Sequence, residues 1–148
     1  MAVLHKFLKK KNFIKANLKL TKTDHFEVIA KINGVKGRFI LDTGASNTCV
    51  GFDKIQHFNL KSKSSDIKAA GAGATDMKTQ ISKKNKLQIG KWEMKKLQIV
   101  LFDLNHVNEA LASQNASPVD GIIGADVLKK SRAIIDYHKK TLYLKETK

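Results

Sequence analysis

An apolar run that ends in an acid is the feature that most constrains this chain. In the segment FILDTGASNTCV, residues 39–50, three apolar residues lead directly into Asp42, and four small residues follow it. The apolar part is typical of a buried strand, but an ionised carboxylate at the end of such a strand is costly unless it is paired or hydrogen-bonded. The turn amides and the hydroxyls of Thr43 and Ser46 could hold that carboxylate in one orientation. Asp42 is therefore either a structural cap that closes an Asx-turn or an acid with a chemical role.

The segments around this run have the pattern of two β-hairpins. Residues 26–32 alternate apolar and polar side chains, as expected of a half-buried strand, and residues 35–41 return as the second arm. The Asn-Gly pair at 33–34 supplies the positive φ that a tight reversal needs. A second strand-turn-strand pattern covers residues 86–104 and reverses at the Gly-Lys pair 90–91. The two hairpins predict a chain in which strands dominate.

The remainder of the chain predicts short helices and a last hairpin. Apolar residues at helical spacing indicate a helix over residues 105–112. A second short helix is predicted around residues 127–128, where two apolar residues precede lysines. Residues 133–137 and 142–144 then read as the two arms of a final hairpin.

Two segments of the chain resemble the motifs of aspartic proteases. ILDTGAS, residues 40–46, resembles their active-site motif, and DGIIGADVL, residues 120–128, resembles the second, Gly-centred motif of the retroviral-type, single-domain branch. The order of elements also agrees, and the resemblance covers residues 24–145. It implies a mainly β, single-domain retropepsin-like acid-protease fold, which is closed and barrel-like and has one or two short helices.

The resemblance implies a role for each motif residue. Asp42 would be the catalytic acid. The small residues after it would support the active-site loop, namely Thr43, Gly44, Ala45 and Ser46. The second motif would contribute Ile122, Ile123 and Gly124. The flap over the substrate would contain Ala70, Gly71, Ala72 and Gly73. A plain flexible linker is the alternative interpretation of that last segment.

One chain supplies half of the site that the resemblance implies. The protease reaction uses two aspartates that share one proton, whereas this chain has a single Asp-Thr-Gly sequence. Asp120 is followed by Gly121 but belongs to the second motif, where a structural role at the strand end is expected. We therefore expect a homodimer in which Asp42 of one subunit meets Asp42 of the other. A water activated between them would hydrolyse peptide bonds of a peptide or protein substrate, without metal or organic cofactor.

Two departures from the retroviral pattern limit what the resemblance implies. Those enzymes commonly have Asp where Ser46 stands and Arg where Ala125 stands, and the two form a salt bridge near the dimer contact. Both partners are absent here, so the dimer contacts must be built differently. The alternative function is a catalytically silent module of the same fold, which binds an extended peptide or an acidic partner through its lysines.

Length and charge limit the number of domains and the classes of partner that we expect. The 148 residues fit one domain, and we expect a basic N-terminal segment, residues 1–20, ahead of a protease domain over residues 21–148. The 28 basic residues exceed the 13 acidic ones, which gives a net charge of +15 and attracts anionic partners. The lysines are spread through almost every segment, and only Arg38 and Arg132 offer the guanidinium fork that nucleic-acid readers favour. Nucleic acid is therefore not expected as a partner.

The N-terminal segment suggests a weak contact with an anionic surface. Leu4, Phe7 and Leu8 could line one face of a short basic helix that rests on such a surface, although a frayed or docked terminus is the alternative. No apolar run reaches the roughly 18 to 20 residues that a membrane span needs, and the first apolar stretch is too short for a signal peptide. We expect no transmembrane segment and a cytoplasmic location.

Cysteine and histidine usage indicates neither a redox centre nor a metal site. Cys49 is the single cysteine, so no intrachain disulfide can form, and a reducing compartment is expected. Its strand-like neighbours are typical of a small buried hydrophobic residue. The five histidines are scattered without ligand spacing, and no metal is expected.

Overall fold

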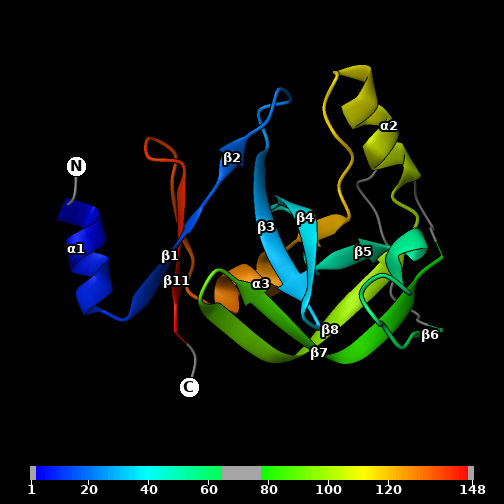
Figure 1. Ribbon diagram of the computed structural model, residues 1–148, viewed down its shortest axis with the longest axis horizontal. Coiled ribbons are helices and arrows are strands. Elements are labelled where there is room, and N and C mark those ends of the chain that lie inside the picture. The colour runs from blue at the N-terminus through cyan, green and yellow to red at the C-terminus, as the bar shows by residue number, and fades with distance from the viewer. Residues whose placement is uncertain (1–2, 65–77, 147–148) are drawn as a thin grey trace.

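The structure is a computed structural model that describes residues 3–64 and 78–146 (Figure 1). Its helices are α1 (Val3–Lys10), α2 (Asn105–Ser113) and α3 (Ala125–Lys130), with a 3-10 turn at Phe52–Lys54. Its strands are β1 (Phe13–Asn17), β2 (Lys19–Leu20), β3 (Phe26–Ile32), β4 (Val35–Leu41), β5 (Cys49–Gly51), β6 (Lys63–Ser64), β7 (Gln80–Ile89), β8 (Trp92–Phe102), β9 (Gly121–Ile123), β10 (Ile134–Asp136) and β11 (Thr141–Lys145). The mainly β prediction is confirmed, and α1 adds a third α-helix to the one or two expected.

The larger sheet closes into a barrel. Its eight strands follow the order β2-β3-β4-β9-β5-β8-β7-β6, and β7 pairs with β3 as well. That extra pairing, with Lys31 opposite Gln88 and Ile32 opposite Leu87, closes the six strands from β3 to β7. The enclosed core includes the fully buried side chains of Phe39, Phe58 and Trp92. The closed, barrel-like architecture is therefore confirmed.

Both expected hairpins form. β3 pairs with β4 through a turn in which Asn33 has φ 52° and Gly34 has φ 83°, and β7 pairs with β8 through Gly90. The Asn33 amide also donates to the carbonyl of Phe58 at 2.9 Å and to the Asn85 side chain at 3.0 Å. The turn that reverses the first hairpin thus also fastens it to the second.

One residue of the first hairpin departs from simple alternation. Glu27 lies between inward-facing apolar residues and was expected on the exposed face, but it is buried. The Arg38 guanidinium explains this, because its Nε and Nη2 atoms each lie 2.7 Å from the same Glu27 carboxylate oxygen. A buried carboxylate is tolerated when it is paired in this way.

A parallel pairing between β4 and β9 brings the two motif segments side by side. Leu41 lies opposite Ile123 and Phe39 lies opposite Gly121, although the two strands are about 80 residues apart in sequence. Because the strands run in the same direction, the residues that follow each strand emerge at the same edge. Asp42 and Gly124 are those residues.

The two ends of the described chain share a second sheet. β11 pairs with β1 on one side and with β10 on the other. Residues 13–17, which the sequence analysis assigned to a basic N-terminal segment, therefore lie in one sheet with the C-terminal strands. α1 packs beside this sheet through the buried Leu8 and through the His5 ring, whose centroid is 6.2 Å from that of Tyr143. No helix in the described residues is long and apolar enough to cross a membrane.

Candidate active site

The Asp42 carboxylate lies on a short loop that begins where β4 ends. The Asp42 N–H donates to the Ile123 carbonyl at 3.0 Å, which fixes the start of the loop. The Gly44 N–H donates to Asp42 Oδ1 at 2.9 Å, and the Ala45 N–H donates to the Asp42 carbonyl at 3.2 Å. Asp42 itself is half-buried, and the loop leaves its carboxylate with one amide donor among the described residues. This carboxylate retains free lone pairs to bind a water or a second carboxyl.

The hydroxyl support expected for Asp42 is not what the structure has. Within the described residues, no hydrogen bond joins the Asp42 carboxylate to the hydroxyl of Thr43 or Ser46, and both of those residues are exposed. The turn amide of Gly44, which the sequence analysis also expected to support the carboxylate, does donate to it. Of the expected support, the structure therefore shows the amide part but not the hydroxyl part among the described residues.

The second motif lies directly behind this loop. Ile122 and Ile123 are buried, and the Ala125 N–H donates to the Ala45 carbonyl at 2.6 Å. A Cβ at Gly124 would lie 2.8 Å from the Ala45 oxygen and 2.8 Å from backbone atoms of Asn47. Because real Cβ atoms do not approach backbone so closely, this glycine is what allows the two motifs to touch.

A threonine and an aspartate that the sequence analysis did not single out join the two motifs. The Thr48 N–H and hydroxyl donate to the two carboxylate oxygens of Asp126, at 3.0 and 2.8 Å. The same hydroxyl accepts the Gly124 N–H at 3.1 Å. Thr48 is fully buried and Asp126 is half-buried, so the bond to Gly124 is shielded from water and the two bonds to Asp126 are partly shielded. The sequence offers only a weak signal for this contact, namely a threonine directly before an apolar strand-like run and, 78 positions later, an acid at the start of a predicted helix.

The positions of Ser46 and Ala125 show how the missing ion pair is replaced. Ser46 is exposed, and Ala125 meets the loop through its backbone N–H rather than through a charged side chain. The contact between Thr48 and Asp126 provides the side-chain link between the first loop and α3.

Asp120, the first acid of the second motif, has partners on both carboxylate oxygens. Its Oδ2 accepts the Arg38 N–H at 2.9 Å, and its Oδ1 lies 3.5 Å from the Lys54 ammonium. Its backbone N–H donates to the Arg38 carbonyl at 2.8 Å, and its carbonyl accepts the Gly51 N–H. These contacts hold the start of β9 against β4 and β5.

Cys49 adjoins the site, but its thiol is unreactive at neutral pH. Its thiol is buried and lies 3.1 Å from the Asn47 carbonyl, to which it donates. Burial, followed by the negative charges of Asp126 and Asp42, raises the pKa of the Cys49 thiol to about 12. The thiolate that a nucleophile requires is therefore scarce at neutral pH.

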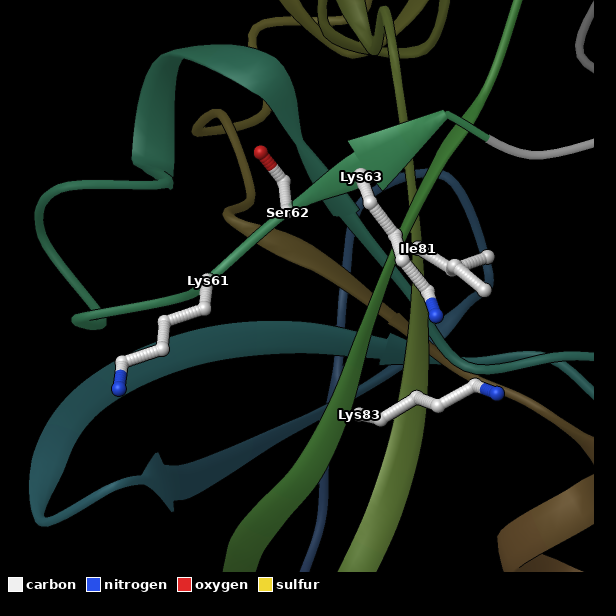
Figure 2. Close-up of a pocket in the computed structure, with 5 residues that line it drawn as sticks. All are labelled: Lys61, Ser62, Lys63, Ile81 and Lys83. Atoms are coloured by element: carbon white, nitrogen blue, oxygen red, sulfur yellow. The ribbon is translucent and has the colours of Figure 1, made fainter.

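A separate open pocket lies at the base of β6 and β7 (Figure 2). It has a volume of about 250 Å³ and is lined by Lys61, Ser62, Lys63, Ile81 and Lys83. Figure 2 shows Lys63 and Lys83 extending to the same side as Ile81, whereas Lys61 points away. None of these residues belongs to either motif, and none is an acid.

The expected flap residues Ala70, Gly71, Ala72 and Gly73 lie outside the described residues. The described residues hold no group of His, Cys, Asp and Glu side chains that could bind a metal ion.

Known proteins share the fold, and a family model covers the first motif and nearly all of the second. A sequence model of the family described as aspartyl protease matches residues 28–127, which include Asp42 and Gly124. A retropepsin-like aspartic protease from Rickettsia conorii is similar in structure, with a TM-score of 0.59, 22% sequence identity and 89% of each chain covered. The EIAV protease, complexed with the inhibitor HBY-793, is similar with a TM-score of 0.55, 18% identity, and 74% of this chain and 90% of that chain covered. No curated protein sequence matches the chain. The two solved structures have the retropepsin-like fold found here, and the family match spans most of the chain, so this protein belongs to the aspartyl protease family.

Proposed function

We propose that this protein is an aspartic endopeptidase whose catalytic site is assembled from two copies of Asp42, one from each subunit of a homodimer. The observation that carries the proposal is the contrast between Asp42 and Asp120, the acids at the two ends of the β4–β9 strand pair. Asp120 is bonded on both carboxylate oxygens, whereas Asp42 accepts one amide hydrogen bond and lies on an open loop. Membership of the aspartyl protease family and the retropepsin-like fold support protease chemistry at Asp42.

The need for a second copy follows from the chemistry. A single carboxylate cannot both accept a proton from the attacking water and donate one to the scissile carbonyl. Two adjacent carboxyls can, because like charges at hydrogen-bond distance favour a state with one shared proton. A two-fold axis close to the Asp42 loop provides this pair without a second motif in the chain.

The proposed reaction proceeds in two steps. The ionised Asp42 accepts a proton from water, and the water oxygen bonds to the carbonyl carbon of the substrate. The protonated Asp42 of the other subunit donates its proton to the carbonyl oxygen, which gives a tetrahedral diol. The first Asp42, now protonated, then donates its proton to the amine nitrogen as the C–N bond breaks, and the Asp42 of the other subunit accepts a proton from one hydroxyl of the diol. The products are a carboxylic acid and an amine, and the pair again holds one shared proton.

A subunit-mixing experiment tests the shared site directly. The parent chain and Asp42→Asn are mixed in equal amounts under conditions of subunit exchange, and cleavage of a peptide library is measured. Mixed dimers retain one carboxyl and should be inactive, so activity should fall to roughly half of that given by the same amount of parent chain alone. Unchanged activity would mean that one chain works by itself.

Asp103→Asn is the matched control for the mixing experiment. It removes the same charge from an exposed acid whose Oδ1 accepts the Asn105 N–H, an interaction that an amide oxygen can keep. Mixing the parent with this variant should leave activity unchanged. If the parent chain binds library peptides without cleaving any, and Asp42→Asn binds them equally well, the silent binding module is the correct function instead.

A further inference from the structure

The outer side of α1 carries apolar side chains that nothing in the described structure covers. Val3 is 69% exposed, Phe7 is 57% exposed and Leu4 is 38% exposed. The helix is nevertheless docked, because Leu8, one turn after Leu4 on the side toward the sheet, is 3% exposed and the His5 ring lies near that of Tyr143. Figure 1 shows α1 at one end of the molecule, with β1 and β11 on its inner side. We name Val3, Leu4 and Phe7 the apolar stripe of α1.

Positive charge surrounds this apolar stripe. Lys6, Lys9 and Lys10 of the helix are all exposed, and the Nζ of Lys11 lies 5.8 Å from the centroid of the Phe7 ring. The sequence from residue 1 to residue 23 contains seven lysines and neither Asp nor Glu. The combination of an apolar stripe with flanking lysines and no acid has the chemistry of a helix that lies in the interface of an anionic membrane.

We propose that α1 docks the protein on the surface of an anionic phospholipid bilayer. The apolar stripe enters the boundary between headgroups and acyl chains, and the flanking lysines contact the phosphate and carboxylate groups of the lipids. The docked inner side of α1 holds the rest of the protein at a fixed orientation on that surface.

A bilayer explains the stripe better than a second copy of the chain does. Two α1 helices that met face to face would bring their lysines together, and like charges in contact oppose association. An anionic bilayer removes the apolar side chains from water and neutralises the lysines at the same time. This inference does not depend on the proposed protease activity, because no residue of the motifs takes part.

Vesicle co-sedimentation of the full chain tests the proposal. The protein should bind vesicles of phosphatidylcholine and phosphatidylserine, should bind vesicles of phosphatidylcholine alone much more weakly, and should be released by salt. Phe7→Ser should weaken binding roughly tenfold, because one large apolar side chain no longer leaves water. Ile29→Ser is the matched control, since Ile29 is an exposed apolar residue on β3, 45% exposed, and its change should leave binding unaltered.

A second pair of variants distinguishes vesicle binding through α1 from binding through the overall positive charge. Lys6→Gln with Lys10→Gln should weaken vesicle binding roughly tenfold. Lys61→Gln with Lys83→Gln removes the same charge from exposed lysines at the pocket of Figure 2 and should have little effect. An equal loss in both double variants would overturn the proposal, because binding would then depend on net charge alone.

A fluorescent variant tests the proposal without removing the apolar side chain, so that a loss of folding cannot be mistaken for a loss of binding. Phe7→Trp keeps a large apolar side chain, and its emission should shift to shorter wavelength with the phosphatidylserine vesicles and not with phosphatidylcholine alone. No shift would overturn the proposal. An unchanged vesicle affinity of Phe7→Ser would also overturn it. If the same variant no longer bound polyglutamate, the partner would be an acidic polypeptide. If it no longer self-associated, the partner would be a second copy of the chain.

Discussion

Two acids border the same parallel strand pair and are held in very different ways. Asp120 precedes β9, and both oxygens of its carboxylate have partners, the Arg38 N–H and the Lys54 ammonium. Asp42 follows β4, and its carboxylate accepts the Gly44 N–H. Because β4 and β9 are parallel, the two acids lie at opposite ends of the pair. The comparison teaches that a strand-end acid is structural when its oxygens are occupied and is open to chemistry when they are not.

Exchanging each acid for its amide gives the largest expected effect and separates the two roles. Asp42→Asn should lower peptide turnover at least about a thousandfold, because an amide cannot accept the proton of the attacking water. Its free energy of unfolding should change by less than about 0.5 kcal/mol, since the amide oxygen still accepts the Gly44 N–H. Asp120→Asn should instead lower the free energy of unfolding by about 1 kcal/mol and retain turnover per folded molecule. Urea unfolding and peptide cleavage measure both quantities, and an equal loss of turnover in the two variants would break the comparison.

Replacing Gly124 tests how tightly the second motif packs against the Asp42 loop. Gly124→Ala forces backbone atoms of Ala45 and Asn47 to move, and should lower the free energy of unfolding by roughly 2 to 3 kcal/mol. Gly44→Ala is the matched change on the loop, where the new Cβ would lie 3.3 Å from the Asp42 Oδ1. Since a side-chain oxygen can yield, its expected effect is below about 1 kcal/mol. Thermal unfolding of both variants checks the difference, and equal effects would mean that the loop and α3 are not in firm contact.

The parts of the site that local patterns encode were predictable. The alternation in residues 26–32, the Asn-Gly turn and the order of the two motifs gave the barrel hairpins and the neighbourhood of Asp42 and Gly124. These features depend on residues close in sequence, or on motifs with a distinctive composition.

The remaining contacts depend on residues that no local pattern links. Thr48 and Asp126 are 78 positions apart, and each taken alone resembles an ordinary polar residue near an element end. Glu27 fits the exposed face of an alternating strand, and its burial depends on Arg38 across the hairpin. The pairing of β1 with β11 joins the two ends of the described chain, so periodicity could not assign the first strand to that sheet.

The contact between Thr48 and Asp126 should have a moderate effect on stability that also reaches the Asp42 loop. Thr48→Val removes the hydroxyl that bonds Asp126 and Gly124, and should lower the free energy of unfolding by about 1 to 2 kcal/mol. Thr141→Val is the control, because Thr141 is also buried and its hydroxyl donates to the Lys139 carbonyl far from both motifs. Both variants should be less stable, but only Thr48→Val should lower turnover per folded molecule. If the control lowers turnover equally, Thr48 does not position the Asp42 loop.

The smallest expected effect comes from Cys49, which reports how well the Asp42 end of the strand pair is buried. Burial and the charges of Asp126 and Asp42 raise its pKa from 9.0 to about 12, so the folded state favours the neutral thiol. The thiol therefore contributes stability that is fully present below about pH 9 and is lost as the pH rises toward 12. Between about pH 8 and about pH 10, the free energy of unfolding of the parent, relative to Cys49→Ala, should fall by roughly 1 kcal/mol. Over this pH range the fall depends on ionisation of the thiol in the unfolded chain as long as the folded pKa stays above about 11, so the same fall is expected when both chains also carry Asp42→Asn, because Asp42 is the last of the three causes. No fall in the parent would mean that the Cys49 thiol ionises as readily in the folded state as in the unfolded chain, and that the Asp42 end of the strand pair is open to water.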